Sequence, residues 1–230
     1  MSESTLASPE TLEGSRPLDV RWLGCVAYGE ALALQEALLA AVAAGERPDS
    51  LLLLEHEPVY TLGRGADEAD LLGAPRHLGV PVFRVGRGGG VTFHGPGQLV
   101  GYPIVRLSGH GRDVHRYVRS LETSVVAACR ALAVEAWLRP NSTGVWTANG
   151  KIASIGVGVR RGVAYHGVAI NVATDLSYFE AIVPCREPGL RLTSIQVIRG
   201  CAPPIQRAAE VFAACFAEEF GYSFEGRVCG

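Results

Sequence analysis

The sequence is almost without lysine. Its 21 basic residues comprise a single lysine, Lys151, and otherwise only arginines. A compositional bias toward arginine would explain this ratio and would leave Lys151 as a chance remainder. A functional explanation is that an ammonium can release its proton when its surroundings lower its pKa, whereas a guanidinium stays charged. Both explanations remain open from composition alone.

The sequence also lacks a strong net charge and a long apolar run. A net charge of −2 gives no basic character, so we expect no nucleic-acid partner. The longest apolar candidate, residues 31–44, contains Gln35 and Glu36, so we expect neither a membrane span nor a membrane partner. The N-terminal residues lack the basic start and apolar middle of a signal peptide. We therefore expect a cytoplasmic protein.

Clustered metal ligands are missing as well. The six cysteines are scattered without a C-x-x-C pair, and the six histidines show no H-E-x-x-H spacing. This excludes a disulfide framework and predicts that no metal is bound. Most cysteines are expected to be small buried residues. Cys185 differs because it follows Val-Pro in a loop beside Arg186, and a nearby cation favours a thiolate. An inert cysteine is the alternative.

The remaining composition is that of a globular domain, with 48% hydrophobic and 19% charged residues among 230. We expect a disordered tail over residues 1–17, one domain over residues 18–222 and a C-terminal tail over residues 223–230. Apolar residues at helical spacing predict helices over residues 28–44, from Asp113 to about residue 134, and over residues 204–220. Shorter helical segments are expected at residues 68–72 and, capped by Thr174 or Asp175, through residue 181.

Strand patterns alternate with these helices. Asn149-Gly150 is a strong hairpin signal, and it predicts an antiparallel meander. Pro103 predicts an edge strand or a bulge, because proline has no N–H to donate. The order of elements favours one α+β domain. The expected strands cover residues 18–24, 50–54, 59–63, 81–85, 98–107, 144–147, 151–160 and 163–172.

A glycine-rich stretch lies at residues 84–102 and holds seven of the 28 glycines. It is not a P-loop, since it has no lysine. It is not a dinucleotide-binding fingerprint either, because that motif is followed by a helix and this stretch is followed by β-forming residues. Such a stretch can cradle an anion or a thin ligand, or it can be a plain bulge between strands. His94 and His166 each precede a glycine at a strand end. Each can line a pocket or simply pack.

Several motifs occur together in a fixed order. R-G-G-G-V-T-F-H-G-P-G-Q-L-V-G-Y-P begins at Arg87, K-I-A-S-I-G at Lys151, H-G-V-A-I-N at His166, and A-I-V-P-C ends at Cys185. The upstream L-L-L-L-E-H-E-P-V-Y-T-L-G-R at residues 51–64 matches too. Together they resemble the octanoyl-acyl-carrier-protein:protein octanoyltransferases, or lipoyl(octanoyl) transferases, over about residues 20–199. The resemblance implies the catalytic-domain fold of biotin and lipoate protein ligases, a mixed, largely antiparallel sheet flanked by helices.

The resemblance also implies an acyl transfer in two steps. Cys185 matches the nucleophile that takes an octanoyl or lipoyl group from the phosphopantetheine arm of acyl carrier protein. Lys151 matches the lysine that lowers the pKa of that cysteine. The acceptor is a lysine on a lipoyl domain of a 2-oxoacid dehydrogenase or of the glycine cleavage H protein. No cofactor is expected, since the pantetheine arm arrives with the substrate. The substrate-binding positions implied are Arg87, Gly88, Gly89, Gly90, Val91, Thr92, Phe93, His94, Ser154, Ile155, Gly156, Gly167, Val168 and Ala169.

Two other functions are compatible with parts of this pattern. An ATP-dependent lipoate or biotin ligase of the same fold would activate the acid as an adenylate and would need no cysteine. The pairing of Lys151 with Val-Pro-Cys185 favours the transferase. A non-catalytic binding domain would have no reason to keep both residues. Two departures from the family pattern, Gly90 and Phe93, lie outside the proposed chemistry.

Overall fold

The computed structural model describes residues 16–72, 79–110, 113–184, 187 and 189–223. Cys185 and Arg186 lie outside these residues. The elements in chain order are β1 (Arg16–Val26), α1 (Tyr28–Ala44), β2 (Asp49–His56), β3 (Val59–Leu62), η1 (Glu68–Asp70), β4 (Val82–Arg84), β5 (Val91–His94), β6 (Gln98–Arg106), η2 (Leu107–His110), α3 (Val114–Ala131), β7 (Trp137–Leu138), β8 (Val145–Thr147), β9 (Gly150–Arg160), β10 (Val163–Asn171), η3 (Leu176–Ala181), α4 (Ile195–Arg199), α5 (Ile205–Phe220) and β11 (Tyr222–Ser223).

The main sheet has eight strands in the order β11-β1-β2-β6-β10-β9-β8-β7. β1 runs parallel to both β2 and β11, and every other neighbouring pair in the sheet is antiparallel. The mixed, largely antiparallel sheet of the sequence prediction is therefore confirmed, as is the meander of β8, β9 and β10.

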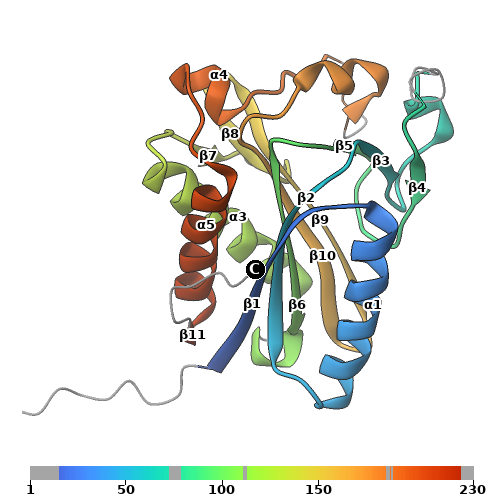
Figure 1. Ribbon diagram of the computed structural model, residues 1–230, viewed down its shortest axis with the longest axis vertical. Helices are drawn as coiled ribbons and strands as arrows, with labels where there is room; N and C mark the ends of the chain where they lie inside the picture. The colour runs from blue at the N-terminus through green and yellow to red at the C-terminus, as the bar shows by residue number, and fades with distance from the viewer. Residues whose placement is uncertain (1–15, 73–78, 111–112, 185–186, 188, 224–230) are drawn as a thin grey trace, which may run out of the picture.

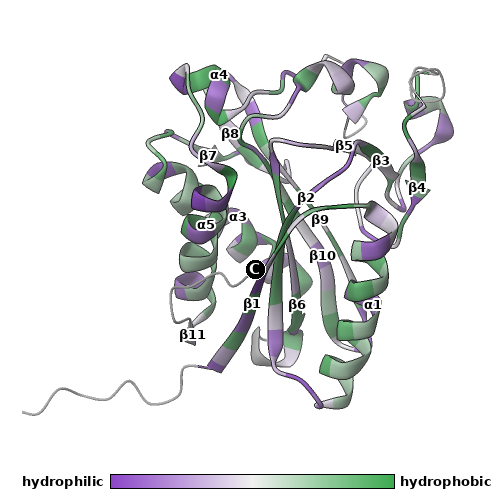
Figure 2. Cartoon of the chain, viewed as in Figure 1, coloured by the Kyte–Doolittle hydropathy of each residue, from purple (hydrophilic) through white to green (hydrophobic). Residues whose placement is uncertain are grey.

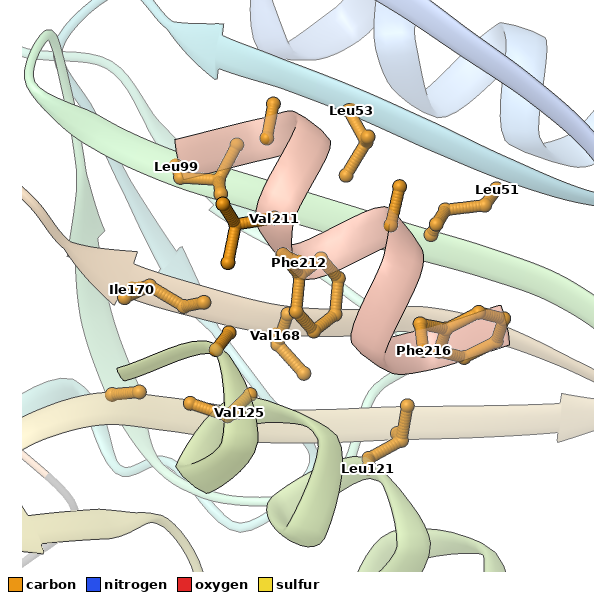
Figure 3. Close-up of a cluster of buried hydrophobic side chains, with 14 of the residues drawn as sticks. Leu51, Leu53, Leu99, Leu121, Val125, Val168, Ile170, Val211, Phe212 and Phe216 are labelled. Carbon is orange, nitrogen blue, oxygen red and sulfur yellow. The ribbon is translucent and has the colours of Figure 1, made fainter. Parts of the chain in front are cut away.

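Helices cover both faces of this sheet (Figure 1), with α1 on one side and α3 and α5 on the other. The larger core lies on the side of α3 and α5, where Phe212 packs among Leu99 and Val168 (Figure 3). The smaller core joins α1 to the opposite face through Leu39 and Leu52. Apolar residues predominate in α1 (Figure 2), which buries one face against the sheet. This layered packing holds β6, β9 and β10 rigidly in the middle of the molecule.

A second sheet of three strands, in the order β4-β3-β5, lies beside the N-terminal end of α1 (Figure 1). Its β3 is parallel to β4 and antiparallel to β5. Tyr60 and Phe93 pack there against Phe179 of η3. The glycine-rich stretch thus runs from β4 of the small sheet through β5 and into β6 of the large one, and it joins the two sheets.

The expected helices all form, with α1 having the predicted bounds and Gly45 ending it in a left-handed conformation. The sequence did not predict β5, β7, β11, η2 or α4. β1 begins at Arg16, and Arg16 and Pro17 pair with β11, so both ends of the expected domain fall inside paired strands. No helix within the described residues is long and apolar enough to cross a membrane.

The expectation of an edge strand at Pro103 is wrong. β6 lies between β2 and β10 in the middle of the sheet. Pro103 pairs with Leu51 of β2, whereas the described β10–β6 register has no pair between Ala164–Val105 and Val168–Gly101. The proline, which cannot donate a hydrogen bond, lies where this ladder is interrupted.

The general expectation for cysteines is also wrong for the described ones. Only Cys129 is fully buried among them; Cys25 and Cys201 are exposed and Cys215 is partly exposed. All four are free thiols.

Candidate active site

A pocket lies where the glycine-rich loop and β5 cover β9 and β10. It collects all the predicted substrate-binding residues except Gly88 and Phe93, although their segments are up to 82 positions apart in the chain. Three side chains that were not predicted to bind substrate complete the wall. The lining residues are Tyr28, Arg87, Gly89, Gly90, Val91, Thr92, His94, Tyr102, Ser154, Ile155, Gly156, His166, Gly167, Val168 and Ala169.

The Arg87 side chain holds the glycine-rich loop in shape. Its guanidinium is buried and donates hydrogen bonds to the carbonyls of Gly88 and Gly90, at 3.0 Å each. It also donates to the carbonyl and the hydroxyl of Thr61 in β3, at 2.8 Å each. Planar guanidinium groups suit such multiple contacts. Arg87 therefore acts here as a clamp between the loop and β3, and it leaves its positive charge in the pocket wall.

Gly88 and Phe93 lie outside the pocket lining and stabilise the segments that form it. The Gly88 N–H donates to the carbonyl of Val157 at 2.8 Å and so ties the loop to β9. Phe93 stacks on Tyr178, with ring centroids 4.4 Å apart, on the far side of β5. The pocket floor is bare backbone where Gly156 of β9 pairs with Gly167 of β10. A Cβ atom on Gly156 would lie 3.1 Å from Gly88 O, a tight contact, so the glycine lets the loop approach β9 closely.

A buried polar network leads from the pocket to Lys151. His94 Nδ1 donates to Gln98 Oε1 at 2.7 Å, and Gln98 Nε2 donates to Asn171 Oδ1 at 3.0 Å. Asn171 Nδ2 donates to the Thr193 carbonyl at 3.1 Å, and the Thr193 N–H donates to the Lys151 carbonyl at 3.0 Å. Buried networks that are satisfied in this way rigidify a site.

The buried histidines beside the pocket are neutral. His56 Nδ1 donates to the Val26 carbonyl at 3.0 Å, so its Nε2 accepts from the Tyr102 hydroxyl at 2.8 Å. Burial lowers the pKa of His56 to about 4. Burial, followed by the nearby His56 and Arg87, holds the pKa of His94 well below its ordinary value. A cationic form would be costly in this dry site next to a guanidinium.

His166 has an unusual backbone. Its φ is +58°, a left-handed conformation that few non-glycine residues adopt. Its N–H donates to Gln35 Oε1 of α1 at 3.0 Å. Ala164 and Val168 on either side point into the larger core, whereas the His166 ring contacts Tyr102 and Tyr165 on the opposite face of the sheet. The left-handed turn thus brings the ring to the pocket side.

Lys151 lies near the start of β9, three residues before Ser154. Val145 pairs with Ala153 and Trp146 pairs with Lys151, so β9 carries one extra residue, Ile152. Ile152 and Ala153 both pack into the larger core, although consecutive strand residues normally point to opposite faces. This bulge returns Lys151 to the face that carries Ser154.

The Lys151 side chain is 3% exposed and lies against Gly144. A Cβ atom on Gly144 would lie 2.4 Å from Lys151 Cε and 3.0 Å from Nζ, and Gly144 has a φ of +124°. Trp146 lies on another side, with its ring centroid 5.7 Å from Lys151 Nζ and 4.6 Å from Arg139 Cζ. Gly144 and Trp146 therefore lie on two sides of the Lys151 ammonium.

Cys185 is outside the described residues, but the chain on both sides of it is anchored. The N–H of Val183 donates to the Asp70 carbonyl at 2.8 Å. Glu187 Oε1 lies 4.0 Å from Arg139 Nη1. The Lys151 N–H donates to the carbonyl of Arg191 at 2.9 Å, and Leu192 bridges to Lys151. The segment that carries Cys185 therefore ends directly on the backbone of Lys151.

Sequence reasoning did not predict Tyr28, Tyr102, Gln98 and Asn171 at the site. Gln98, Tyr102 and Asn171 belong to the motifs that carry the family resemblance, so the signal was present. Tyr28 opens a helix as an ordinary apolar residue and gave no signal. His94 and His166, for which packing was the alternative, both line the pocket.

The matches to known proteins cover the segments that form the pocket. Residues 27–217 match the family model of the lipoyl protein ligase A/B catalytic domain. An octanoyltransferase of Geobacter metallireducens is 49% identical over 81% of this chain and 85% of its own length. An octanoyltransferase of Rubrobacter xylanophilus is 46% identical over 92% of this chain and 98% of its own.

Solved structures show the same fold at low identity. A putative lipoate protein ligase of Thermoplasma acidophilum with bound lipoic acid superposes with a TM-score of 0.72 at 20% identity, covering 92% of this chain and 88% of that one. A biotin protein ligase of Aquifex aeolicus gives a TM-score of 0.52 at 14% identity, covering 90% of this chain and 69% of that one. From the family match and the identity to these relatives, the chain belongs to the lipoyl protein ligase A/B catalytic domain family and, within it, to the octanoyltransferases.

Proposed function

We propose that this protein transfers an octanoyl group from acyl carrier protein to the lysine of a lipoyl domain, through a thioester on Cys185. The observation that supports this most is the return of the Cys185 segment to the backbone of Lys151, through Arg191 and Leu192. Five residues separate Cys185 from Arg191 in the sequence. A nucleophile and the lysine that assists it must come within hydrogen-bond reach, and this connection brings the segment that follows Cys185 back to the Lys151 backbone.

The chemistry balances without a further reagent. The Cys185 thiolate attacks the carbonyl carbon of the acyl-carrier thioester, and the pantetheine sulfur leaves as a thiol after taking a proton from the Lys151 ammonium, which becomes a neutral amine. One thioester replaces another, so no ATP is needed. The amine of the acceptor lysine then attacks the Cys185 thioester, and an amide forms while the cysteine thiolate leaves. The amine must lose a proton in this step, and neutral Lys151 is the base that accepts it.

The pocket suits the acyl group. Its floor is the Gly156–Gly167 pair, and Val91, Val168 and Ala169 contribute apolar wall. A thin aliphatic chain can lie on bare backbone, where a side chain would block it. The ammonium of Lys151 is the favourable neighbour for a thiolate, since free cysteine is mostly protonated at neutral pH.

The test is to mix the protein with octanoyl-acyl carrier protein and to measure its intact mass. We expect one octanoyl adduct, which maps to Cys185 and is lost in Cys185→Ser. Cys201→Ser is the matched control, because Cys201 is an exposed thiol outside the pocket lining. An adduct that survives in Cys185→Ser, or that is lost in Cys201→Ser, contradicts the proposed nucleophile.

The second step needs its own measurement. The purified acyl-enzyme is mixed with an apo lipoyl domain in the absence of ATP, and octanoylation of the domain lysine is followed by mass. Transfer without ATP is the expected result. If octanoate is transferred only when ATP is added, the protein is a ligase. That candidate shares the fold, since lipoate-protein ligase A bound with ATP superposes with a TM-score of 0.72.

A further inference from the structure

The pocket end farthest from Lys151 contains an unusual group of polar atoms. Of the buried side-chain nitrogen and oxygen atoms without a hydrogen-bond partner among the described residues, three are His166 Nδ1, His166 Nε2 and Gln35 Nε2. The two residues are in contact through the His166 N–H and Gln35 Oε1. His166 is 1% exposed and Gln35 is fully buried. Buried polar atoms without partners are uncommon and call for an explanation.

The backbone conformation of His166 is also strained. A non-glycine residue at a φ of +58° stores strain that the surrounding structure must offset, and such residues cluster at functional sites. An ordinary strand conformation would turn the His166 ring into the larger core beside Ala164 and Val168. The strained conformation instead brings the polar ring to the end of the pocket.

The length of the pocket can be read from the strand register. Ser154 pairs with Ala169 at the end near Lys151, and Val157 pairs with His166 at the other end. Three residues of strand span about 10 Å. An extended polypeptide advances roughly 3.3–3.6 Å over three bonds, so the seven carbon–carbon bonds of an octanoyl chain span about 8 Å. The pocket between Ser154 and His166 therefore has the length of an eight-carbon chain.

We propose that His166, held by Gln35, is the end wall that limits the acyl chain to about eight carbons. This inference rests on the proposed function, because the carbonyl carbon must lie at the Cys185 and Lys151 end and the terminal methyl at the opposite end. Each further methylene would have to displace the ring or cover its unpaired nitrogens and the Gln35 amide. Covering a polar atom with hydrocarbon is unfavourable, so a polar wall rejects longer chains better than an apolar one.

The test compares acyl carrier proteins that bear eight-, ten- and twelve-carbon chains, by the rate of adduct formation on Cys185. One methylene in a pocket changes selectivity by about 10- to 200-fold. The unaltered protein should therefore prefer eight carbons to ten by at least about tenfold. His166→Gly, which removes the wall and accepts the left-handed backbone, should reduce this preference at least about fivefold and should accept twelve carbons.

Two further variants complete the design. Arg161→Gly is the matched control, since Arg161 also has a positive φ, of +53°, but lies outside the pocket lining in the turn between β9 and β10. It should keep the original preference. Asparagine also tolerates the left-handed conformation, so His166→Asn provides the same test if the glycine variant does not fold. Thermal unfolding establishes which variants are folded.

The possible failures are distinct. A folded His166→Gly or His166→Asn protein that is acylated with eight carbons and keeps the original preference overturns the end wall alone. An equal change in Arg161→Gly also overturns it. Absence of a Cys185 adduct from every acyl carrier with the unaltered protein overturns the proposed function, and this inference with it.

Discussion

Gly144→Ala should test how the fold positions Lys151. The new Cβ atom would lie 2.4 Å from Lys151 Cε and 2.7 Å from the Ala153 carbonyl oxygen. The lysine can move, but the carbonyl belongs to the middle of the sheet. The Gly144 N–H is also held by buried Glu122, whose Oε1 accepts it at 2.7 Å. The loop therefore cannot move away without losing that hydrogen bond.

The expected loss of stability in Gly144→Ala has two contributions. A residue with a side chain at a φ of +124° costs about 1–3 kcal/mol in backbone strain, and overpacking costs about 1–3 kcal/mol. We expect the free energy of unfolding to fall by about 3 kcal/mol. For a chain of this size, this lowers Tm by roughly 6–12 °C. Because the ammonium is displaced, octanoyl transfer should fall about 100-fold, at the lower end of what a positioned base contributes.

Gly45→Ala separates the loss of stability from the loss of transfer activity. Gly45 ends α1 at a φ of +78°, and a Cβ atom there would have no neighbour within 4 Å. This variant should lose about 1–2 kcal/mol from strain alone and keep full transfer activity. Thermal unfolding and transfer assays at 20 °C measure both quantities while the proteins are folded. Normal transfer by folded Gly144→Ala would refute the argument that Gly144 sets the position of Lys151.

Two other predictions follow from the buried groups. Lys151→Arg keeps the positive charge but removes the movable proton, so transfer to the lipoyl domain should fall at least about 100-fold; near-normal turnover in the same assay would exclude Lys151 as the base. Burial lowers the pKa of His56 to about 4 and, with the charge of Arg87, that of His166 to about 3, both from 6.5. The unfolded chain therefore takes up protons first as the pH falls: stability is full above about pH 6.5, and each histidine removes about 1.4 kcal/mol per pH unit on the way down toward its folded pKa. Urea unfolding at pH 7 and pH 5 should show a loss of roughly 2 kcal/mol per histidine, and equal values would contradict the burial argument.

The sequence predicted the site segments well because motifs and hairpin signals are local. The Asn149-Gly150 turn predicted the pairing of β8 and β9, and this pairing carries Lys151 and Ser154. The glycine-rich stretch was predicted to touch a ligand, and it forms one wall of the pocket. Arg87, predicted to bind substrate, lines the pocket, and its hydrogen bonds also hold the loop itself, which the sequence did not indicate.

The remaining features depend on contacts between distant segments. The bulge at Ile152 decides which face Lys151 occupies, but it depends on how β8 and β9 pair and leaves no mark in a single strand. The left-handed backbone of His166 depends on Gln35, 131 positions earlier, whose burial breaks an otherwise apolar helix face. Pro103 indicated an edge strand because the interruption of its ladder with β10 cannot be read from β6 alone. Cys185, the predicted nucleophile, stays a prediction.

The burial of Lys151 has a consequence for the fate of an activated acyl group. A thioester on Cys185 would react with an accessible lysine amine, including one on the surface of the enzyme that carries it. This chain has one lysine, and it is 3% exposed. The surface therefore offers no lysine on which the acyl group could be lost. A reagent that reacts with exposed lysine side chains would consequently label those of the acceptor domain and find none on the enzyme.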